Sequence, residues 1–173
     1  MFLFGDDFVF LGAPTGGFKF SDVLGVASTV LKRVKIQSIY AEKKVTEKGS
    51  EGKRDKTELV FDRHELAPGK RVILVEDVCN NFSTTEELCK LVDKHGSFVA
   101  GIACILNRSS ADKFKDIPVF AIETIPTVQF KQEDPAVRDD IDRGNIEWKP
   151  KPTENWLSLI TLMKEARARL DVT

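Results

Sequence analysis

Residues 72–85, which read VILVEDVCNNFSTT, decide the fold of this chain. They open with the apolar, largely β-branched residues of the strand predicted over residues 71–75, RVILV, and such a run is typical of a central strand buried on both faces. Two adjacent carboxylates, Glu76 and Asp77, end the run. A short polar loop then leads to a helix, which the apolar spacing predicts over residues 84–95. A strand, a loop and a helix in this order form the repeating unit of a sheet whose strands are joined by helices.

The same alternation of strands and helices continues on both sides of this stretch. Further strands are predicted over residues 8–12, 35–41, 57–61, 98–106 and 118–122, and helices over residues 21–33 and 155–170. Ser21 is the expected N-cap of the first of these helices. Strands that alternate with helices imply right-handed crossovers. We therefore predict an α/β fold with a mainly parallel, twisted sheet flanked by helices.

Two stretches fit no regular element. Residues 42–56 form a long polar loop, of the kind that is usually disordered or serves as a functional lid. Residues 124–152 are rich in proline and are expected to form an irregular cap. We predict one domain overall, with a core over residues 1–123 and a C-terminal hood and helix over residues 124–173 packed on that core.

The composition excludes several classes of protein. The chain has 173 residues, of which 42% are hydrophobic and 31% charged, and its net charge of -1 argues against a dominant nucleic-acid surface. The apolar start is interrupted by Asp6 and Asp7 and reads as a strand rather than a signal peptide. Three widely spaced cysteines and two histidines favour buried thiols over a zinc site or a disulfide framework. We expect a cytoplasmic protein with no nucleic-acid partner and no membrane partner.

The acidic strand end and the loop after it suggest a site for a phosphorylated sugar. In an open parallel sheet, ligands bind beyond the carboxyl ends of the strands. A loop that feeds a helix N-terminus offers backbone N–H groups to a phosphate. Carboxylates beside an anion make sense if they hold sugar hydroxyls or a cation such as Mg²⁺. The alternative is an acidic strand end followed by an N-capped helix, without a ligand.

The stretch GKRVILVEDVCNNFST, residues 69–84, resembles the phosphoribosyl pyrophosphate (PRPP) signature of the type I phosphoribosyltransferases. The resemblance implies a Rossmann-like core of that family. It also implies that Glu76 and Asp77 face the ribose hydroxyls and bind a metal indirectly, through PRPP or water. Phe82 stands where the family favours glycine, in a loop that can require a positive φ. The loop residues implied to cradle the 5′-phosphate are Val78, Cys79, Asn80, Asn81, Phe82, Ser83 and Thr84, with the Cys79 thiol interpreted as a packing group.

Two further segments carry the resemblance. LGAPTGG, residues 11–17, lies where the family places its pyrophosphate loop, so Thr15, Gly16 and Gly17 are implied to bind PRPP. A plain glycine turn between a strand and a helix is the alternative. YAEKKVTEKGSEG, residues 40–52, is similar to the flexible catalytic loop of orotate phosphoribosyltransferases.

A mobile cationic lid suits the departure of pyrophosphate, because it neutralises the charge that develops on the leaving oxygens and excludes water. Lys43 falls on a lysine of the family pattern and is predicted to be catalytic together with Glu76 and Asp77. Lys43, Lys44 and Lys48 are predicted to bind PRPP, and Lys53 could also reach the site. A solvated charged loop without a catalytic role is the alternative.

The base would be read at the end of the strand that follows the PRPP helix. LNR, residues 106–108, lies where orotate enzymes carry Asp-Arg, and a guanidinium is well suited to a planar carboxylate. Arg108 and Asn80 are therefore the predicted base-binding residues. Phe130 and Trp148 are candidates for stacking on the base, and core packing is the alternative for both.

Together these motifs imply a Mg²⁺-dependent phosphoribosyltransferase that moves ribose 5-phosphate from PRPP to a nucleobase and releases pyrophosphate. Orotate is the first candidate acceptor, which would place the protein in pyrimidine nucleotide biosynthesis with orotidine 5′-phosphate as the product. The alternatives are a purine base or another pyrimidine, a non-catalytic regulator that senses PRPP or a nucleotide, and an α/β domain with coincidental motifs. The resemblance further implies a homodimer.

Overall fold

The structure is a computed structural model that describes residues 7–48, 56–130, 133–145, 157–158 and 160–161. The chain forms two compact units, Met1–Thr127 and Val128–Thr173. Every strand of the described chain lies in the first unit. None of the described helices is both long enough and apolar enough to cross a membrane.

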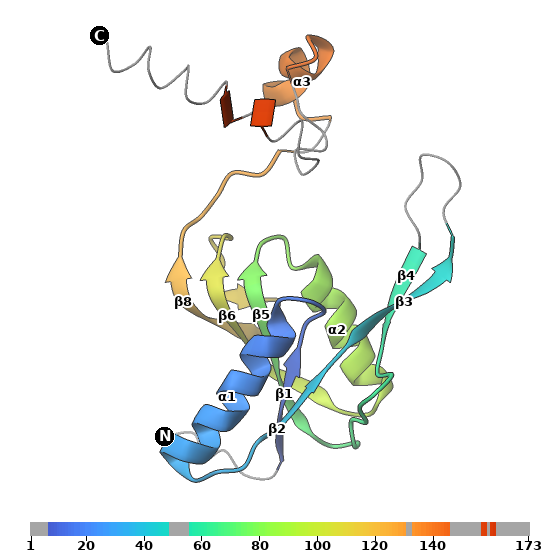
Figure 1. The fold of residues 1–173 in the computed structure, drawn as a ribbon, viewed down its shortest axis with the longest axis vertical. Coiled ribbons are helices and arrows are strands. Elements are labelled where there is room, and N and C mark those ends of the chain that lie inside the picture. Colours follow the sequence, from blue (N-terminus) through green and yellow to red (C-terminus); the bar gives the residue numbers. More distant parts are fainter. Residues whose placement is uncertain (1–6, 49–55, 131–132, 146–156, 159, 162–173) are drawn as a thin grey trace. The chain divides into compact units, whose positions relative to one another are not determined.

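A six-stranded sheet forms the centre of the first unit, with the strand order β2-β1-β5-β6-β8-β7 (Figure 1). All neighbours are parallel except β7, which runs antiparallel to β8. The strands are β1 (Phe8–Gly12), β2 (Gln37–Tyr40), β5 (Arg71–Cys79), β6 (Phe98–Asn107), β7 (Lys113–Phe114) and β8 (Ile117–Thr124). The predicted α/β fold with a mainly parallel sheet is confirmed.

Two helices cover opposite faces of this sheet because the strand residues alternate between the faces. Helix α1 (Gly17–Lys32) packs on a core that includes Phe10 and Val75. Helix α2 (Ser83–Lys94) packs on the larger core, whose fully buried members include Leu74 and Ile102. Strand β5 supplies apolar side chains to both cores, as its β-branched run predicted.

Helix α1 starts earlier than the sequence predicted. Its N-cap is Gly16 rather than Ser21, so the predicted cap was wrong. The Ser21 side chain is fully buried and its hydroxyl donates to the Phe18 carbonyl at 2.7 Å. Residues 17–20 continue the helix upstream of Ser21, which therefore lies inside the helix and not at its end.

Part of the predicted lid is regular structure. Strand β3 (Glu42–Glu47) pairs with β4 (Lys56–Val60) in a separate antiparallel sheet of two strands, so the loop predicted for the start of residues 42–56 was wrong. The polar composition hid the strand because β3 is almost wholly exposed, and its pairing with β4 outweighs its weak strand propensity. Figure 1 shows this hairpin projecting beyond the sheet. Residues 49–55 lie outside the described part of the chain.

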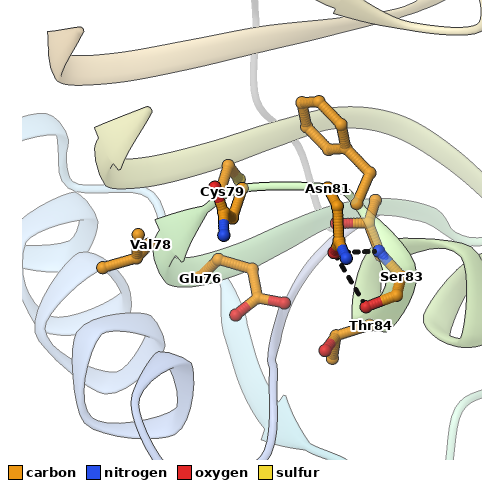
Figure 2. Close-up of a pocket in the computed structure, with 9 residues that line it drawn as sticks. Glu76, Val78, Cys79, Asn81, Ser83 and Thr84 are labelled. Atoms are coloured by element: carbon orange, nitrogen blue, oxygen red, sulfur yellow. Dashed lines mark hydrogen bonds between the residues drawn. The ribbon is translucent and has the colours of Figure 1, made fainter. Parts of the chain in front are cut away.

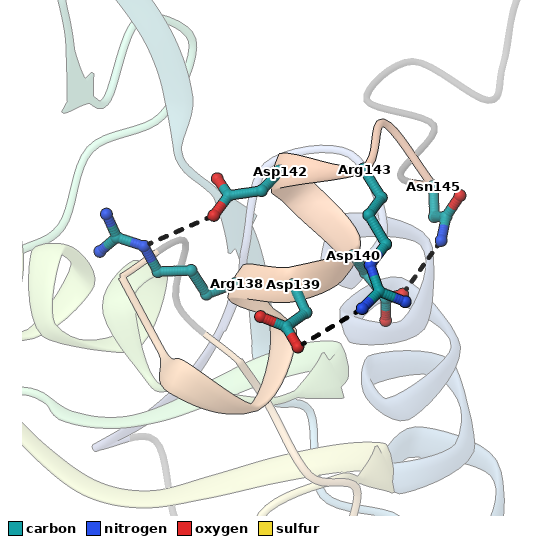
Figure 3. Close-up of polar contacts among 6 residues, drawn as sticks. All are labelled: Arg138, Asp139, Asp140, Asp142, Arg143 and Asn145. Atoms are coloured by element: carbon teal, nitrogen blue, oxygen red, sulfur yellow. Dashed lines mark hydrogen bonds and ion pairs between the residues drawn. The ribbon is translucent and has the colours of Figure 1, made fainter.

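In the second unit, residues 135–142 form a short helix, α3 (Pro135–Asp142), within a stretch that was predicted to be irregular. The Asp134 carboxylate caps it by accepting from the Ala136 N–H at 3.0 Å, and proline occupies the first helical turn. Ion pairs between Arg138 and Asp142 and between residues 139 and 143 follow its surface (Figure 3). Of the helix predicted over 155–170, residues 157–158 and 160–161 are helical and the rest lie outside the described residues.

Candidate functional site

The candidate site lies where the strand order reverses. The chain adds β2 on one side of β1 and then β5 on the other, so the carboxyl ends of β1 and β5 flank a topological switch point. Ligands of open α/β sheets bind in the crevice at such a point. The two ends are tied together, since the Ala13 N–H donates to the Val75 carbonyl at 2.9 Å. The loops that precede α1 and α2 therefore start side by side.

The loop before α1, which we call the glycine loop (residues 13–17), needs its glycines. A Cβ atom at Gly16 would overlap the carboxylate of Asp77, and a Cβ atom at Gly17 would overlap the carbonyl of Val75. Only glycine allows this approach between the loop and β5. Thr15 adopts a left-handed conformation with φ 74°, which is rare for a β-branched residue and costs about 1–3 kcal/mol. Strain of this kind is concentrated at ligand-binding loops.

The two acidic residues at the end of β5 differ in environment. Glu76 is 8% exposed, and burial together with the neighbouring Asp77 charge raises the pKa of its carboxyl to about 7. Asp77 is exposed, and its carboxylate accepts from the Val78 N–H at 2.9 Å and lies against the Gly16 backbone. Glu76 thus faces the loop before α2, whereas Asp77 faces the glycine loop.

One lysine of the hairpin has an electrostatic influence on Glu76. Lys43, which pairs with Leu59 in the hairpin, lies close enough to Glu76 to lower the pKa of the Glu76 carboxyl. Lys44 and Lys48 are exposed on the same hairpin. Lys43 is therefore the described lysine of this hairpin whose charge acts on Glu76, although burial and the Asp77 charge outweigh it.

The loop after β5, which we call the phosphate loop (residues 78–84), surrounds a pocket of about 130 Å³ (Figure 2). The Asn81 side-chain oxygen accepts from the Ser83 N–H at 3.2 Å and from its hydroxyl at 2.9 Å, which fixes the turn into α2. The pocket is lined by Glu76, Val78, Cys79, Asn80, Asn81, Phe82, Ser83, Thr84 and Thr85. Helix α2 adds a positive dipole end and N–H groups without an intrahelical partner.

Phe82 adopts the positive φ that its position in the family pattern suggested. It is the N-cap of α2, with φ 57° and ψ 19°, and its ring stacks on Phe114 with 5.1 Å between the ring centroids. The sequence did not identify Phe114 as a residue near the site, because β7 has only two residues. The available signal was the polar pair Lys115–Asp116 directly before the apolar run of residues 117–122, which suits a tight turn.

Cys79 lies inside the sheet rather than toward a ligand. Its side chain is 2% exposed, and a hydrogen bond with the Cys104 thiol, together with burial, raises the pKa of the Cys79 thiol. A protonated buried thiol is a poor nucleophile, which agrees with the interpretation of Cys79 as a packing residue.

The predicted base-binding residues lie beside the phosphate loop. The Arg108 N–H donates to the Cys79 carbonyl at 2.7 Å, and the Arg108 Nε donates to the Thr127 hydroxyl at 3.1 Å. Asn107, where orotate enzymes carry aspartate, is buried and holds its own loop through Ser109 and Ala111. Asn80 is half-buried in the pocket wall, Phe130 is exposed, and Trp148 lies outside the described residues.

The residues present fit a divalent cation that is held mostly by its ligand. No cluster of three or more His, Cys, Asp or Glu side chains in the described ranges could hold a metal on its own. Glu76 and Asp77 are nevertheless adjacent at the end of β5, and the Asp77 charge raises the pKa of the Glu76 carboxyl, so a nearby cation would stabilise the charged form of both. Mg²⁺ is commonly bound by one or two carboxylates together with substrate phosphates.

Known proteins resemble this chain in sequence and in fold. The model of the phosphoribosyl transferase domain matches residues 3–139. A transcriptional regulator, GfcR of Methanocella arvoryzae, is 33% identical over 60 residues, which cover 35% of this chain and 29% of that protein. The orotate phosphoribosyltransferase of Chlorobium phaeobacteroides is 25% identical over 69 residues, covering 40% of this chain and 36% of that enzyme. These matches span about a third of each relative.

A solved structure extends the likeness to the fold. The adenine phosphoribosyltransferase of Leishmania tarentolae superimposes with a TM-score of 0.51 at 17% identity, over 72% of this chain and 64% of that one. The site geometry, the fold and the family model agree with the resemblance drawn from the sequence motifs. The chain belongs to the phosphoribosyl transferase domain family.

Proposed function

We propose that the protein transfers ribose 5-phosphate from PRPP to a nucleobase and releases pyrophosphate. One observation supports this most strongly: the glycine loop, the Glu76–Asp77 pair and the phosphate loop meet at a single strand switch point. PRPP carries a pyrophosphate, two ribose hydroxyls and a 5′-phosphate, and each loop offers groups suited to one of these parts. Binding one ligand across all three loops would place its anomeric carbon between them.

The chemistry follows from that placement. The bond between the anomeric carbon and pyrophosphate breaks, and pyrophosphate leaves with the bonding electrons. A ring nitrogen of the base forms the new bond and loses its proton. Lys43 and the N-terminus of α1 would stabilise the negative charge on the leaving oxygens. Positioning and charge stabilisation suffice, so no covalent intermediate with the protein is required.

A Mg²⁺ ion fits this proposal. Glu76 and Asp77 would hold it indirectly, through the ribose hydroxyls or water. When bound, Mg²⁺ would neutralise charge on the pyrophosphate.

Orotate is the acceptor that we propose first, because Arg108 extends from a strand end adjacent to the phosphate loop. Its guanidinium could pair with the carboxylate of that base. A purine base is the main alternative. We also propose that the protein acts as a homodimer.

A second candidate function is a regulator that senses PRPP or a nucleotide without turning it over. It is favoured by the 33% identity to a protein named as a transcriptional regulator. Both functions need the same phosphate loop, so only turnover separates them.

The test is pyrophosphate release from PRPP with Mg²⁺, measured separately with orotate, uracil, adenine, guanine, hypoxanthine and xanthine. Release with one base, abolished by Asp77→Asn, is the expected result. A folded protein that binds PRPP but releases no pyrophosphate with any base would contradict the enzyme and support the regulator.

A further inference from the structure

The phosphate loop contains a bulky residue in a conformation that favours glycine. Phe82 has φ 57° and is the N-cap of α2, yet its side chain makes no capping hydrogen bond. Its carbonyl accepts from the Glu86 N–H at 2.9 Å and so starts the helix. A left-handed conformation is a genuine outlier for a bulky residue and needs support from its surroundings.

That support comes from the turn between β7 and β8. The Phe82 and Phe114 rings lie nearly parallel, with an interplanar angle of 27° and 5.1 Å between centroids. Next to them, the Lys115 ammonium lies 3.4 Å from the Glu86 carboxylate and 5.3 Å from the Phe114 ring centroid. These contacts connect the first turn of α2 to the turn between β7 and β8. In the sheet, β6 and β8 separate β7 from β5.

The conformation of Phe82 also shapes the anion pocket. A left-handed residue next to right-handed ones turns successive N–H groups toward one point, which makes a concavity for an anion. Phe82, Ser83 and Thr84 line the pocket of about 130 Å³ beside Glu76. If Phe82 moved to a right-handed conformation, the N–H groups at the start of α2 would point elsewhere.

We infer that Phe114 is a positioning residue for this pocket. Its ring holds Phe82 in the left-handed conformation, and Phe82 in turn aims the N–H groups at the start of α2 toward the bound phosphate. A glycine at position 82 would adopt the same conformation unaided. The stacked pair therefore stabilises the left-handed conformation that a glycine at position 82 would adopt without support. The inference rests on the proposed function only in naming PRPP as the ligand.

The experiment is a cycle of variants that tests this coupling. PRPP and inorganic phosphate affinities are measured by calorimetry for Phe114→Leu and Phe114→Tyr, each in the natural chain and in a Phe82→Gly background. Phe114→Leu should weaken PRPP binding about tenfold in the natural chain, the effect of losing one aromatic pair. Phe114→Tyr keeps the ring and should restore binding. In the Phe82→Gly background, Phe114→Leu should change affinity less than about twofold.

Phe98→Leu serves as the matched control, because Phe98 is a half-exposed aromatic residue at the start of β6, whereas the phosphate loop lies beside the end of that strand. It should leave PRPP affinity unchanged. An equal loss from Phe114→Leu in both backgrounds, or none in either, would overturn the inference. A natural chain that binds neither PRPP nor phosphate would overturn both the inference and the proposed function. Normal binding without turnover would contradict the proposed enzyme alone.

Discussion

At the scale of single residues, the buried carboxyl of Glu76 and the glycines of the glycine loop are the positions of the site where substitutions should have the clearest effects. Glu76 carries a pKa of about 7 because it is buried beside another carboxylate, whereas its ordinary value is 4.5. The folded state therefore binds the proton more tightly than the unfolded state does. The stability that protonation of Glu76 contributes is therefore fully present below about pH 4.5 and is lost as the pH rises through about 7.

Glu76→Gln should remove this pH dependence, because glutamine has the same shape and no charge. Below pH 4.5 the variant and the natural protein should unfold at similar urea concentrations. Above pH 7 the variant should be more stable, by on the order of 3 kcal/mol. Urea unfolding at pH 4.5 and pH 8 measures the difference. A constant gap between the two proteins across this range would show that Glu76 titrates normally.

Alanine substitutions at the two glycines of the glycine loop should have different effects, one mainly on protein stability and the other mainly on PRPP binding. Gly17→Ala places a Cβ against the Val75 backbone, which cannot move aside, so unfolding free energy should fall by about 1–3 kcal/mol. Gly16→Ala instead displaces the Asp77 side chain, so it should weaken PRPP binding with less loss of stability. Thermal unfolding and calorimetry on both variants provide the measurement. The reverse ranking would contradict the packing seen at this loop.

At the scale of helices and strands, the sequence predicted the elements that have a clear apolar pattern. The run at residues 71–75 identified β5, and the helix α2 begins and ends within one residue of its predicted bounds. The β3 strand was not predicted because its side chains are almost all polar, so no apolar alternation marks it. The Phe82–Phe114 stack was not predicted because a two-residue strand leaves no periodic signal. The absence of an apolar pattern is the common cause of these omissions.

The position of Lys43 on the hairpin of β3 and β4 leads to a prediction about catalysis. Lys43 lies near Glu76, whereas Lys56 of the same hairpin pairs with Glu47 at 2.6 Å on an exposed surface. Lys43→Ala should slow turnover by about 100-fold, because it removes one charge that stabilises the leaving group. Lys56→Ala is the matched control and should change turnover little. A similar loss from both lysines would indicate a general effect on the hairpin rather than a catalytic role for Lys43.

At the scale of the whole molecule, the first unit exposes an apolar surface on α1. Val23, Val26 and Val30 are 61%, 64% and 71% exposed and share the outward face of this helix. The outer face of α2 instead carries charged residues such as Glu87 and Lys90. A contiguous exposed apolar patch of this kind often marks a surface that contacts another chain. This surface supports the proposed homodimer, and β2 beside it is an edge strand of the six-stranded sheet.

Val26→Lys should therefore produce a monomer. Val26 lies between Val23 and Val30 on the helix, so a charge there would be buried without a partner in any dimer that uses this face. Val128→Lys, which changes another exposed valine, in the second unit, is the matched control and should stay dimeric. Light scattering during size-exclusion chromatography gives the mass of each. If Val26→Lys stays dimeric, then α1 is not at the interface; if the natural chain is already a monomer, the homodimer is wrong.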